Sequence, residues 1–356
     1  MARYGKHGEQ TYRQNFNRKK KDCIDWLLLN LSLARRVLDM DGLLAIAIDP
    51  CYISKAGKKT PHIGRFWSGC AGAVKHGLEI MGIGLLDVAN NKCMMLRAHQ
   101  TIGNSALKMR NKTLVEYYIS VMKRYSKKLL SITDIVVADA FFSTSTFEKG
   151  MSELGFYLVS RFRDNACLHY IPKREKGRGR PRVKGDKIDL ANLNLSCMEE
   201  LHIDGLDGKA YTLEAYAKAL KKRVRLVIWR MPGGKCKLFF STKLSMTGEE
   251  VLKTYRTRFQ IEFCYRDSKQ FTGLMDCQAR HKRQFDFAFN ASFASLNAAK
   301  VFMKDNGMDN SMAKVKSLMF NANYTKLIFD MSRCRPNRTL ISKIVKELIG
   351  WQPKAA

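Results

Sequence analysis

Two aspartates follow buried apolar runs at separate places in the chain. Asp49 comes directly after the run Leu43–Ile48, and Asp139 comes directly after Ile132–Ala138. Each run has the length and composition of a buried strand, and each is expected to stop at its aspartate. A carboxylate at the end of such a strand lies at the rim of a sheet, where polar groups can converge while the core stays apolar. Taken alone, each aspartate could equally begin a turn or cap the next helix.

Besides the two aspartates, a set of polar residues near residue 260 has helical spacing. A helix that turns by roughly 100° per residue places Tyr255, Arg258, Glu262 and Lys269 within a sector of about 60°. An aromatic ring, a guanidinium, a carboxylate and an ammonium group would then share one helix face. The alternative interpretation is a solvent-exposed face with an Arg–Glu pair that contributes only about 0.3–0.5 kcal/mol.

Three carboxylates of this kind point to phosphoryl-transfer chemistry. Carboxylate oxygens are hard ligands that bind Mg²⁺ or Mn²⁺. Two such ions can clamp the attacking and leaving oxygens of an in-line displacement, with water or a DNA 3′-hydroxyl as the nucleophile. The Tyr, Arg and Lys side chains of the same helix face would bind the flanking phosphates.

The charge balance of the 356-residue chain predicts a polyanionic partner. Its 63 Lys and Arg outnumber 32 Asp and Glu, so the net charge is +31. Nucleic acid is the first interpretation, because cationic contacts to its phosphates release counterions and so favour binding. An anionic membrane surface is the second interpretation. No apolar run approaches the ~20 residues that span a bilayer. The first residues lack the apolar core of a signal peptide, and the ten cysteines form no Cys-x-x-Cys pair. We therefore predict a cytoplasmic or nucleoid location.

The residues around the three acids resemble those of a known family. The segment Phe240–Leu274 carries a Tyr-Arg-Glu-Lys signature with gaps of two, three and six residues. It is similar to the third block of bacterial insertion-sequence transposases of the DDE superfamily. Ala47–Asp49 resembles their first block, and Val136–Ser143 resembles their second. The resemblance covers roughly residues 40–300.

This resemblance implies a ribonuclease H-like core in which Asp49, Asp139 and Glu262 are the catalytic residues and the ligands of two Mg²⁺ (or Mn²⁺) ions. It implies cut-and-paste movement of an element with terminal inverted repeats, through metal-dependent cleavage and strand transfer. The partners would be double-stranded DNA, at the element ends and the target, and a second copy of the chain in a homodimer. Two alternatives remain: a non-catalytic DNA-binding protein derived from a transposase, and a stand-alone ribonuclease H-like DNA nuclease.

The expected architecture is α/β, with a ribonuclease H-like mixed sheet flanked by helices. The stretch between Asp139 and Glu262 is far longer than one crossover connection needs, and the resemblance explains it as a β-rich insertion. A helical C-terminal region is expected to follow the catalytic helix. The predicted parts are a basic arm and helix, a reduced DNA-binding region (1–40), the first part of the core (41–155), the insertion with a basic loop at 173–187 (156–244), the catalytic helix of the core (245–279) and the C-terminal helices (280–356).

The predicted insertion holds two further candidates for DNA contact. Trp229 lies between strand-like runs and could stack on a flipped base, and a core tryptophan is the competing interpretation. In the basic loop, Arg178, Arg180 and Arg182 with Gly179 and Pro181 resemble an AT-hook, whose arginines enter a narrow minor groove. A loop that follows phosphates without reading bases is the alternative. Both interpretations make the three arginines DNA-binding residues.

Local signals predict several element boundaries. Thr247 with Glu250 three residues later predicts a capping box at the start of the helix that continues to about Leu274. The turn residues Pro232–Gly234 predict one β-hairpin, and Asn90-Asn91 between two apolar runs predicts another.

Overall fold

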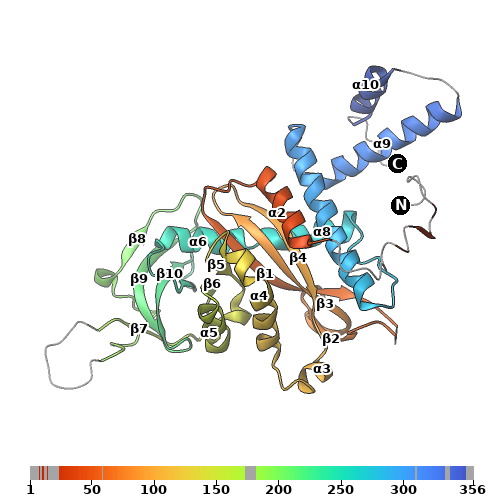
Figure 1. Ribbon diagram of the computed structural model, residues 1–356. Helices are drawn as coiled ribbons and strands as arrows, with labels where there is room; N and C mark the ends of the chain where they lie inside the picture. The colour runs from red at the N-terminus through yellow and green to blue at the C-terminus, as the bar shows by residue number, and fades with distance from the viewer. Residues whose placement is uncertain are drawn as a thin grey trace. The chain divides into compact units, whose positions relative to one another are not determined.

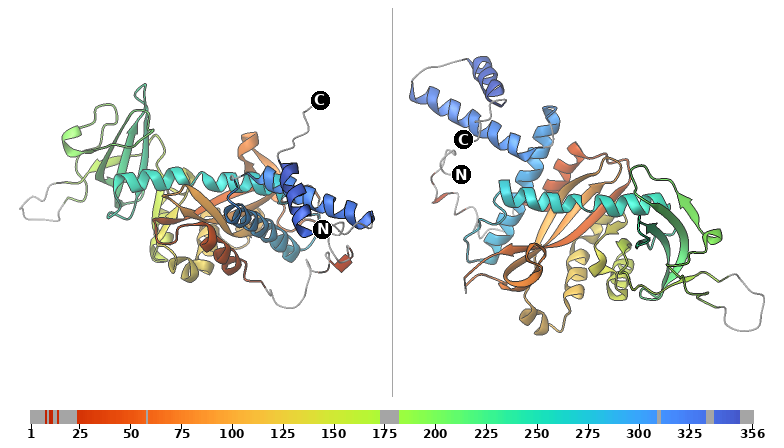
Figure 2. Two further views of the ribbon diagram at one scale, coloured as in Figure 1. Left: turned by 90° about the horizontal axis from the view of Figure 1, so that it is seen from above. Right: turned by 180° about the vertical axis from the view of Figure 1, so that it is seen from behind.

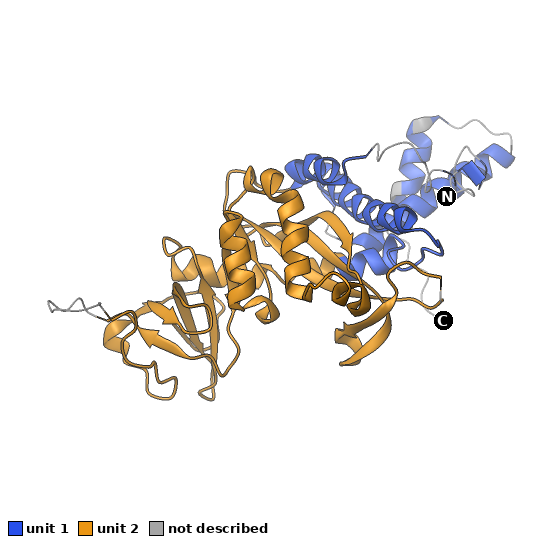
Figure 3. Cartoon of the chain, turned by 60° about the horizontal axis from the view of Figure 1, so that its bottom comes forward, with its two compact units in different colours: residues 1–37, 265–356 blue, residues 38–264 orange. Residues whose placement is uncertain are grey.

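The computed structural model describes residues 8, 10–11, 14, 24–57, 59–172, 182–308, 311–332 and 337–349. Arg178, Arg180 and most of the predicted basic arm lie outside these residues. The chain divides into two compact units, which Figure 3 shows in different colours. One unit is Leu38–Cys264, and the other combines Met1–Val37 with Tyr265–Ala356.

The unit Leu38–Cys264 is built on one mixed sheet. Its order is β2-β3-β1-β5-β6-β11-β10-β9-β7, with β4 paired to β3 and β8 paired to β9. The strands are β1 (Leu44–Ser54), β2 (Gly64–Ser68), β3 (Ala73–Asp87), β4 (Lys92–Gln100), β5 (Ile135–Val137), β6 (Tyr157–Arg161), β7 (Leu168–Tyr170), β8 (Glu199–Leu201), β9 (Lys209–Ala217), β10 (Lys222–Arg230) and β11 (Cys236–Ser241).

The strand directions follow from the connections between them. The consecutive strands β3 and β4 form the hairpin predicted around Asn90-Asn91, and β3 pairs antiparallel with β1. β5 and β6 run parallel to β1, and parallel neighbours need crossover connections. Helix α4 (Leu114–Leu130) precedes β5, and α5 (Ser145–Glu153) connects β5 to β6. This mixed α/β arrangement is consistent with the predicted ribonuclease H-like fold.

Helices cover both faces of this sheet. In Figure 1, α4 and α5 lie on the near face. In the view from behind in Figure 2, α6 (Gly248–Thr257) crosses the opposite face. The short helix α3 (Asn104–Lys108) precedes α4. The capping box predicted for α6 is confirmed, because Thr247 Oγ1 accepts from the Glu250 amide at 3.2 Å and Glu250 Oε2 accepts from the Thr247 amide at 2.8 Å. α6 therefore begins at a fixed place above the sheet.

The predicted end of β1 at Asp49-Pro50 is wrong. β1 continues to Ser54 and stays paired with β3 as far as Ser54 and Gly77. Its pairing with β5, however, ends at Ala47 and Val137. A proline has no N–H to donate, so it is tolerated where one side of the strand needs no ladder partner. Asp49 therefore lies inside β1 but at the rim where β1 and β5 part.

The predicted continuous helix from Thr247 to about Leu274 is also wrong. α6 ends at Thr257, and α7 (Gln260–Phe271) begins after a turn at Arg258 and Phe259. Across this turn the Ile261 and Glu262 amides each donate to the carbonyl three residues earlier, at 3.0 Å. Such bonds tighten the chain to about three residues per turn. The assumption of 100° per residue therefore fails between Tyr255 and Glu262.

The second unit is helical in the residues described. It holds α2 (Trp26–Val37), most of α7, α8 (Lys282–Asp305), α9 (Met312–Met331) and α10 (Arg338–Ile349). Trp26 of α2 meets Phe287 of α8 edge-to-face, with ring centres 5.3 Å apart. The buried Asn297 amide donates to Asn30 Oδ1 at 2.8 Å. A helix near the start of the chain thus packs on a helix near its end. Within the described parts of both units, no helix is long and apolar enough to cross a membrane.

Candidate active site

The register of β1 and β5 brings Asp49 and Asp139 together. Ile46 pairs with Val136 and Ala47 with Val137, so two further residues along the same register Asp49 lies opposite Asp139. Neighbouring strands lie about 4.8 Å apart. Asp139 also caps the short 3₁₀ helix Ala140–Phe142, because its Oδ1 accepts from the Phe141 amide at 3.0 Å. Asp139 therefore serves as a cap and lies at the rim beside Asp49.

Arg258 connects this rim to Glu262 in the first turn of α7. Arg258 Nη2 lies 2.9 Å from Glu262 Oε1, and Nη1 lies 3.5 Å from Asp49 Oδ1. The side chains of Arg258 and Asp49 are 12% and 18% exposed, so their contact is largely shielded from water, whereas Glu262 is 39% exposed. The structure thus gathers the two predicted acids of the sheet and the predicted acid of the helix around one site.

The carboxylate of Asp49 is strongly perturbed. Burial raises the pKa of Asp49 from 3.8 to about 7, and the positive charge of Arg258 opposes this rise. The negative charges of Asp139, Glu262 and Glu79 raise it further. A group with shifted protonation beside two other acids is the electrostatic pattern of a functional site. The same effects also show that the four acids lie close enough to interact.

Glu79 is a fourth acid that the sequence analysis missed. It lies on β3, is 6% exposed and accepts a hydrogen bond from the Tyr118 hydroxyl of α4 at 2.5 Å. Burial raises the pKa of Glu79 above its usual range. Asp49 pairs with Gly82, three residues from Glu79, so the two acids face opposite sides of the sheet. An acid near the start of the apolar run Leu78–Val88, which otherwise holds only Asp87 near its end, was the signal that could have revealed it.

Tyr255 and Lys269 belong to different units of the chain. Tyr255 is half-buried on α6, and its ring centre lies 5.6 Å from Arg258 Cζ and 5.0 Å from the ring of Phe239. Burial raises the pKa of Tyr255, and Asp139 contributes to that rise. Tyr255 therefore lies beside the rim. Lys269 is half-buried on the part of α7 that belongs to the helical unit.

Trp229 is half-buried on β10, so it does not belong to the core. Its indole Nε1 donates to the Asp207 carbonyl at 2.7 Å. Phe239 stacks against the ring at 6.4 Å, and Lys237 Nζ lies 5.0 Å from the ring centre. The ring is thus fixed and partly covered. Of the three loop arginines, the structure describes Arg182 alone, and it is exposed.

The acids have the donor chemistry for a divalent cation. Among the residues that the structure describes, no group of three or more His, Cys, Asp or Glu side chains is arranged to hold a metal ion. Arg258 supplies the positive charge between Asp49 and Glu262 instead. Three interacting carboxylates nevertheless share one rim, and oxygen donors of this kind fit Mg²⁺ or Mn²⁺. The donor chemistry of these residues therefore suits a divalent cation.

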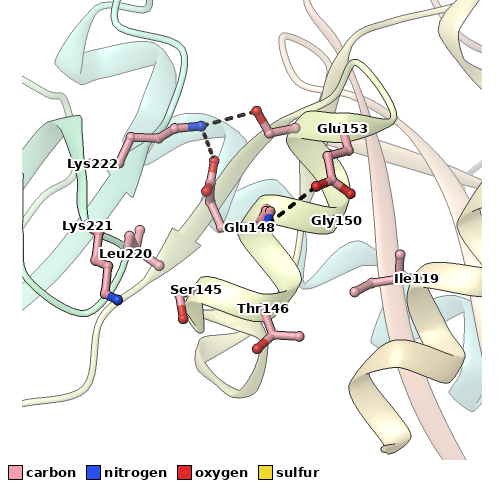
Figure 4. A pocket seen from close by; sticks show the side chains of 11 residues that line it. Ile119, Ser145, Thr146, Glu148, Gly150, Glu153, Leu220, Lys221 and Lys222 are labelled. Atoms are coloured by element: carbon pink, nitrogen blue, oxygen red, sulfur yellow. Dashed lines mark hydrogen bonds and ion pairs between the residues drawn. The ribbon is translucent and has the colours of Figure 1, made fainter. Parts of the chain in front are cut away.

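A cavity of about 740 Å³ lies elsewhere in the same unit, between α5 and the turn that joins β9 to β10 (Figure 4). Lys222 Nζ donates there to Glu148 Oε1 at 2.6 Å and to Ser152 Oγ at 3.1 Å. None of the predicted site residues lines this cavity. The buried acid of this cavity, Glu148, is already paired with Lys222, and this pair joins α5 to β10. The cavity therefore lacks the excess negative charge of the rim.

A comparison with protein families identifies the family of the chain. A family model described as DDE superfamily endonuclease matches residues 1–204. That range includes Asp49 and Asp139 and ends before Glu262. A search of curated proteins finds no match to the chain. The family match spans more than half of the 356 residues. The chain therefore belongs to the DDE superfamily endonuclease family.

Proposed function

We propose that this protein is a DDE transposase that cuts the ends of a bacterial insertion sequence and joins them to target DNA by a cut-and-paste route. Asp49, Asp139 and Glu262 are its proposed catalytic residues. The observation that supports this most is the β1–β5 register, which sets two acids side by side while Arg258 ties Glu262 to one of them. Membership of the DDE endonuclease family supports the reaction class.

In this proposal the three acids hold two Mg²⁺ (or Mn²⁺) ions. When bound, such ions activate a water or a 3′-hydroxyl and stabilise charge on the leaving oxygen. The carboxylates orient the site, and Asp49 must lose its proton before it can act as a ligand. Arg258 keeps Asp49 and Glu262 near each other by offsetting their repulsion. The N–H groups of Arg258 that the two acids do not use would bind a phosphate.

The proposed partners are the inverted-repeat ends and the target, both double-stranded DNA. Tyr255, Arg258 and Lys269 would bind phosphates near the scissile bond, and Arg178, Arg180 and Arg182 would bind DNA further away. Trp229 remains the candidate for base stacking, which requires displacement of Lys237 from its ring. The net charge of +31 supports tight, salt-dependent DNA binding. Action on two ends supports a homodimer on DNA in the nucleoid.

The test is a cleavage and joining assay on the element's own ends. Sequencing the DNA that flanks the gene supplies the terminal repeats, which are then labelled and incubated with full-length protein, Mg²⁺ and a target plasmid. We expect nicking at the repeat end followed by insertion into the plasmid. Glu262→Gln should abolish both products, whereas the exposed Glu249→Gln on α6 should leave them unchanged.

The alternatives give different products in the same assay. Cleavage without insertion would identify a stand-alone nuclease. DNA binding without nicking, at every Mg²⁺ and Mn²⁺ concentration tried, would identify a non-catalytic DNA-binding protein and reject the proposed activity.

A further inference from the structure

Arg161 continues the row of charged residues across a third strand. β6 runs parallel to β5, with Val137 opposite Val159. The ladder continues beyond this pair, because the Ala138 amide donates to the Val159 carbonyl at 3.1 Å. Two residues further along this register, Arg161 lies opposite Asp139. Asp49 of β1, Asp139 two residues past the end of β5 and Arg161 of β6 therefore occupy matching positions along the register.

The two ends of this row face the same side of the sheet. Arg161 pairs with Phe239 of β11, and cross-strand partners share a face. The ring of Phe239 lies 5.0 Å from Tyr255, so this is the face covered by α6. At the other end, Ala47 pairs with Gly84, and a Cβ at Gly84 would lie 3.5 Å from Ile261 Cδ1 of α7. Since Asp49 lies two residues from Ala47, it faces the same helices.

The end of β6 is held firmly by hydrogen bonds. Ser160 Oγ donates to the Asp139 carbonyl at 2.8 Å, and Ser143 Oγ donates to the Arg161 carbonyl at 2.7 Å. The backbone that carries Arg161 is thereby fixed to the segment that carries Asp139. The Arg161 side chain therefore begins from a backbone position that is fixed relative to Asp139.

The Arg161 guanidinium differs from that of Arg258 in its partners. Arg258 contacts two acids, whereas Arg161 forms no ion pair within the described parts of the chain. The buried Nε of each arginine has no hydrogen-bond partner there. The positive charge of Arg161 nevertheless reaches Tyr255 beside the rim, because Arg161 together with Arg258 opposes the rise in the Tyr255 pKa. A fixed arginine without a carboxylate partner is suited to an anionic ligand, and its planar donors match a phosphate.

We propose that Arg161 binds a phosphate of the DNA backbone next to the scissile bond. This inference rests on the proposed function, because it assumes that DNA lies across the rim of Asp49 and Asp139. The acids repel a phosphodiester that approaches them without compensation. Arg161 supplies a cation in the same row, and it positions the strand by holding the neighbouring phosphate.

The test combines protein variants with single methylphosphonates, which replace one charged phosphate by a neutral group. Wild type, Arg161→Ala, Arg161→Lys and the exposed neighbour Arg163→Ala are compared on end DNA that carries one methylphosphonate at each position near the cut. Binding is measured with Ca²⁺, and single-turnover cleavage is measured with Mg²⁺. Thermal unfolding of each variant checks that it is folded.

We expect one methylphosphonate position to weaken wild-type binding and to have no further effect on Arg161→Ala. Arg161→Ala should cleave unmodified DNA roughly 10- to 100-fold more slowly, the range of a lost charge-assisted hydrogen bond. Arg161→Lys should recover part of this loss, because it keeps the charge without the planar fork. Arg163→Ala should show the full wild-type sensitivity to that position.

The proposal is overturned if folded Arg161→Ala keeps the wild-type penalty at every methylphosphonate position. The Ca²⁺ binding measurement requires no cleavage, so it decides the role of Arg161 even if the wild-type protein does not cut DNA. If the wild-type protein does not cleave, but Arg161→Ala changes the sensitivity of binding to one methylphosphonate position, only the proposed catalytic activity is rejected.

Discussion

Arg258 places Nη2 2.9 Å from the carboxylate of Glu262, four residues further along the chain. The tight turn at Arg258 and Phe259 lies between α6 and α7, so this contact spans the break in the helix. Through Nη1 the same guanidinium reaches Asp49 on the sheet at 3.5 Å. Arg258 therefore connects the only helical acid of the proposed site to its buried strand acid.

Replacing Arg258 should impair the site through charge. Arg258→Ala removes the group that lowers the pKa of Asp49, so that pKa should rise above its present value of about 7. At pH 7.5 more Asp49 would be protonated, and cleavage should fall at least about 10-fold and recover partly at higher pH. The pH dependence of single-turnover cleavage measures this. Arg256→Ala, an exposed charge on α6, is the matched control and should leave the profile unchanged.

The raised pKa of Asp49 predicts how metal-free stability depends on pH. The folded protein holds this proton up to about pH 7, whereas the unfolded chain releases it near 3.8. The folded state therefore binds one more proton between these values, and the free energy of unfolding falls as pH rises through this window. Asp49→Asn cannot titrate and so lacks this loss. As pH rises, its free energy of unfolding relative to that of wild type should increase by up to about 1.4 kcal/mol per pH unit and level off above pH 7.

Urea unfolding with EDTA at several pH values measures this difference. The exposed Glu249→Gln is the control for a general change of charge, and its curve should stay parallel to that of wild type. A constant difference between Asp49→Asn and wild type from pH 4 to pH 8 would show that the Asp49 pKa is ordinary.

Much of the site could be predicted from residue types and spacing. The apolar runs before Asp49 and Asp139 mark strands that are fully buried up to the rim, and burial is what an apolar run encodes. The Tyr-Arg-Glu spacing located the helical elements near Glu262. The break at Arg258 could not be foreseen, because helical periodicity tolerates a single tight turn without a visible change in pattern.

The contributions of Glu79 and Arg161 depend on long-range strand pairing. Glu79 interacts with Tyr118, which is 39 residues away in sequence, and Arg161 joins the rim only through the β5–β6 register. Pairing of this kind is set by tertiary packing, which a pattern along one segment does not contain. The end of β1 was misjudged for the same reason, because β3 continues its ladder past Pro50.

The Tyr118–Glu79 hydrogen bond should stabilise the fold and influence Asp49 from the opposite face. Tyr118→Phe removes one donor from a buried carboxyl and should lower the free energy of unfolding by about 1–3 kcal/mol. Glu79→Gln removes a charge that raises the pKa of Asp49, so Mn²⁺ binding should persist to lower pH. Calorimetric titration with Mn²⁺ across pH measures the shift. Tyr117→Phe loses only the bond to the Gln100 carbonyl and should not shift it.

Gly84 sets the space beneath the start of α7. A Cβ at this position would lie 2.9 Å from Cys93 Sγ and 3.5 Å from Ile261 Cδ1. Gly84→Ala should therefore be destabilising chiefly through Cys93, and adding Cys93→Ala should restore most of the stability. Gly84→Val also presses on Ile261, next to Glu262, and should lower stability by about 1–3 kcal/mol and cleavage more strongly. Each Gly84 variant is made with and without Cys93→Ala, and urea unfolding and cleavage are measured for all four proteins. Full rescue of Gly84→Val by Cys93→Ala would contradict the role of Ile261.

The most direct test of the central claim changes the ligand preference of one acid. Asp139→Cys replaces a hard oxygen by a thiolate, which accepts Mg²⁺ poorly and softer divalent ions such as Mn²⁺ better. Single-turnover cleavage of end DNA is measured for Asp139→Cys and wild type in each metal, with DNA binding as the check on folding. The account predicts no detectable cleavage by Asp139→Cys in Mg²⁺ and recovery in Mn²⁺. If Asp139→Cys cleaved in Mg²⁺ at the wild-type rate, the assignment of Asp139 as a metal ligand would be contradicted.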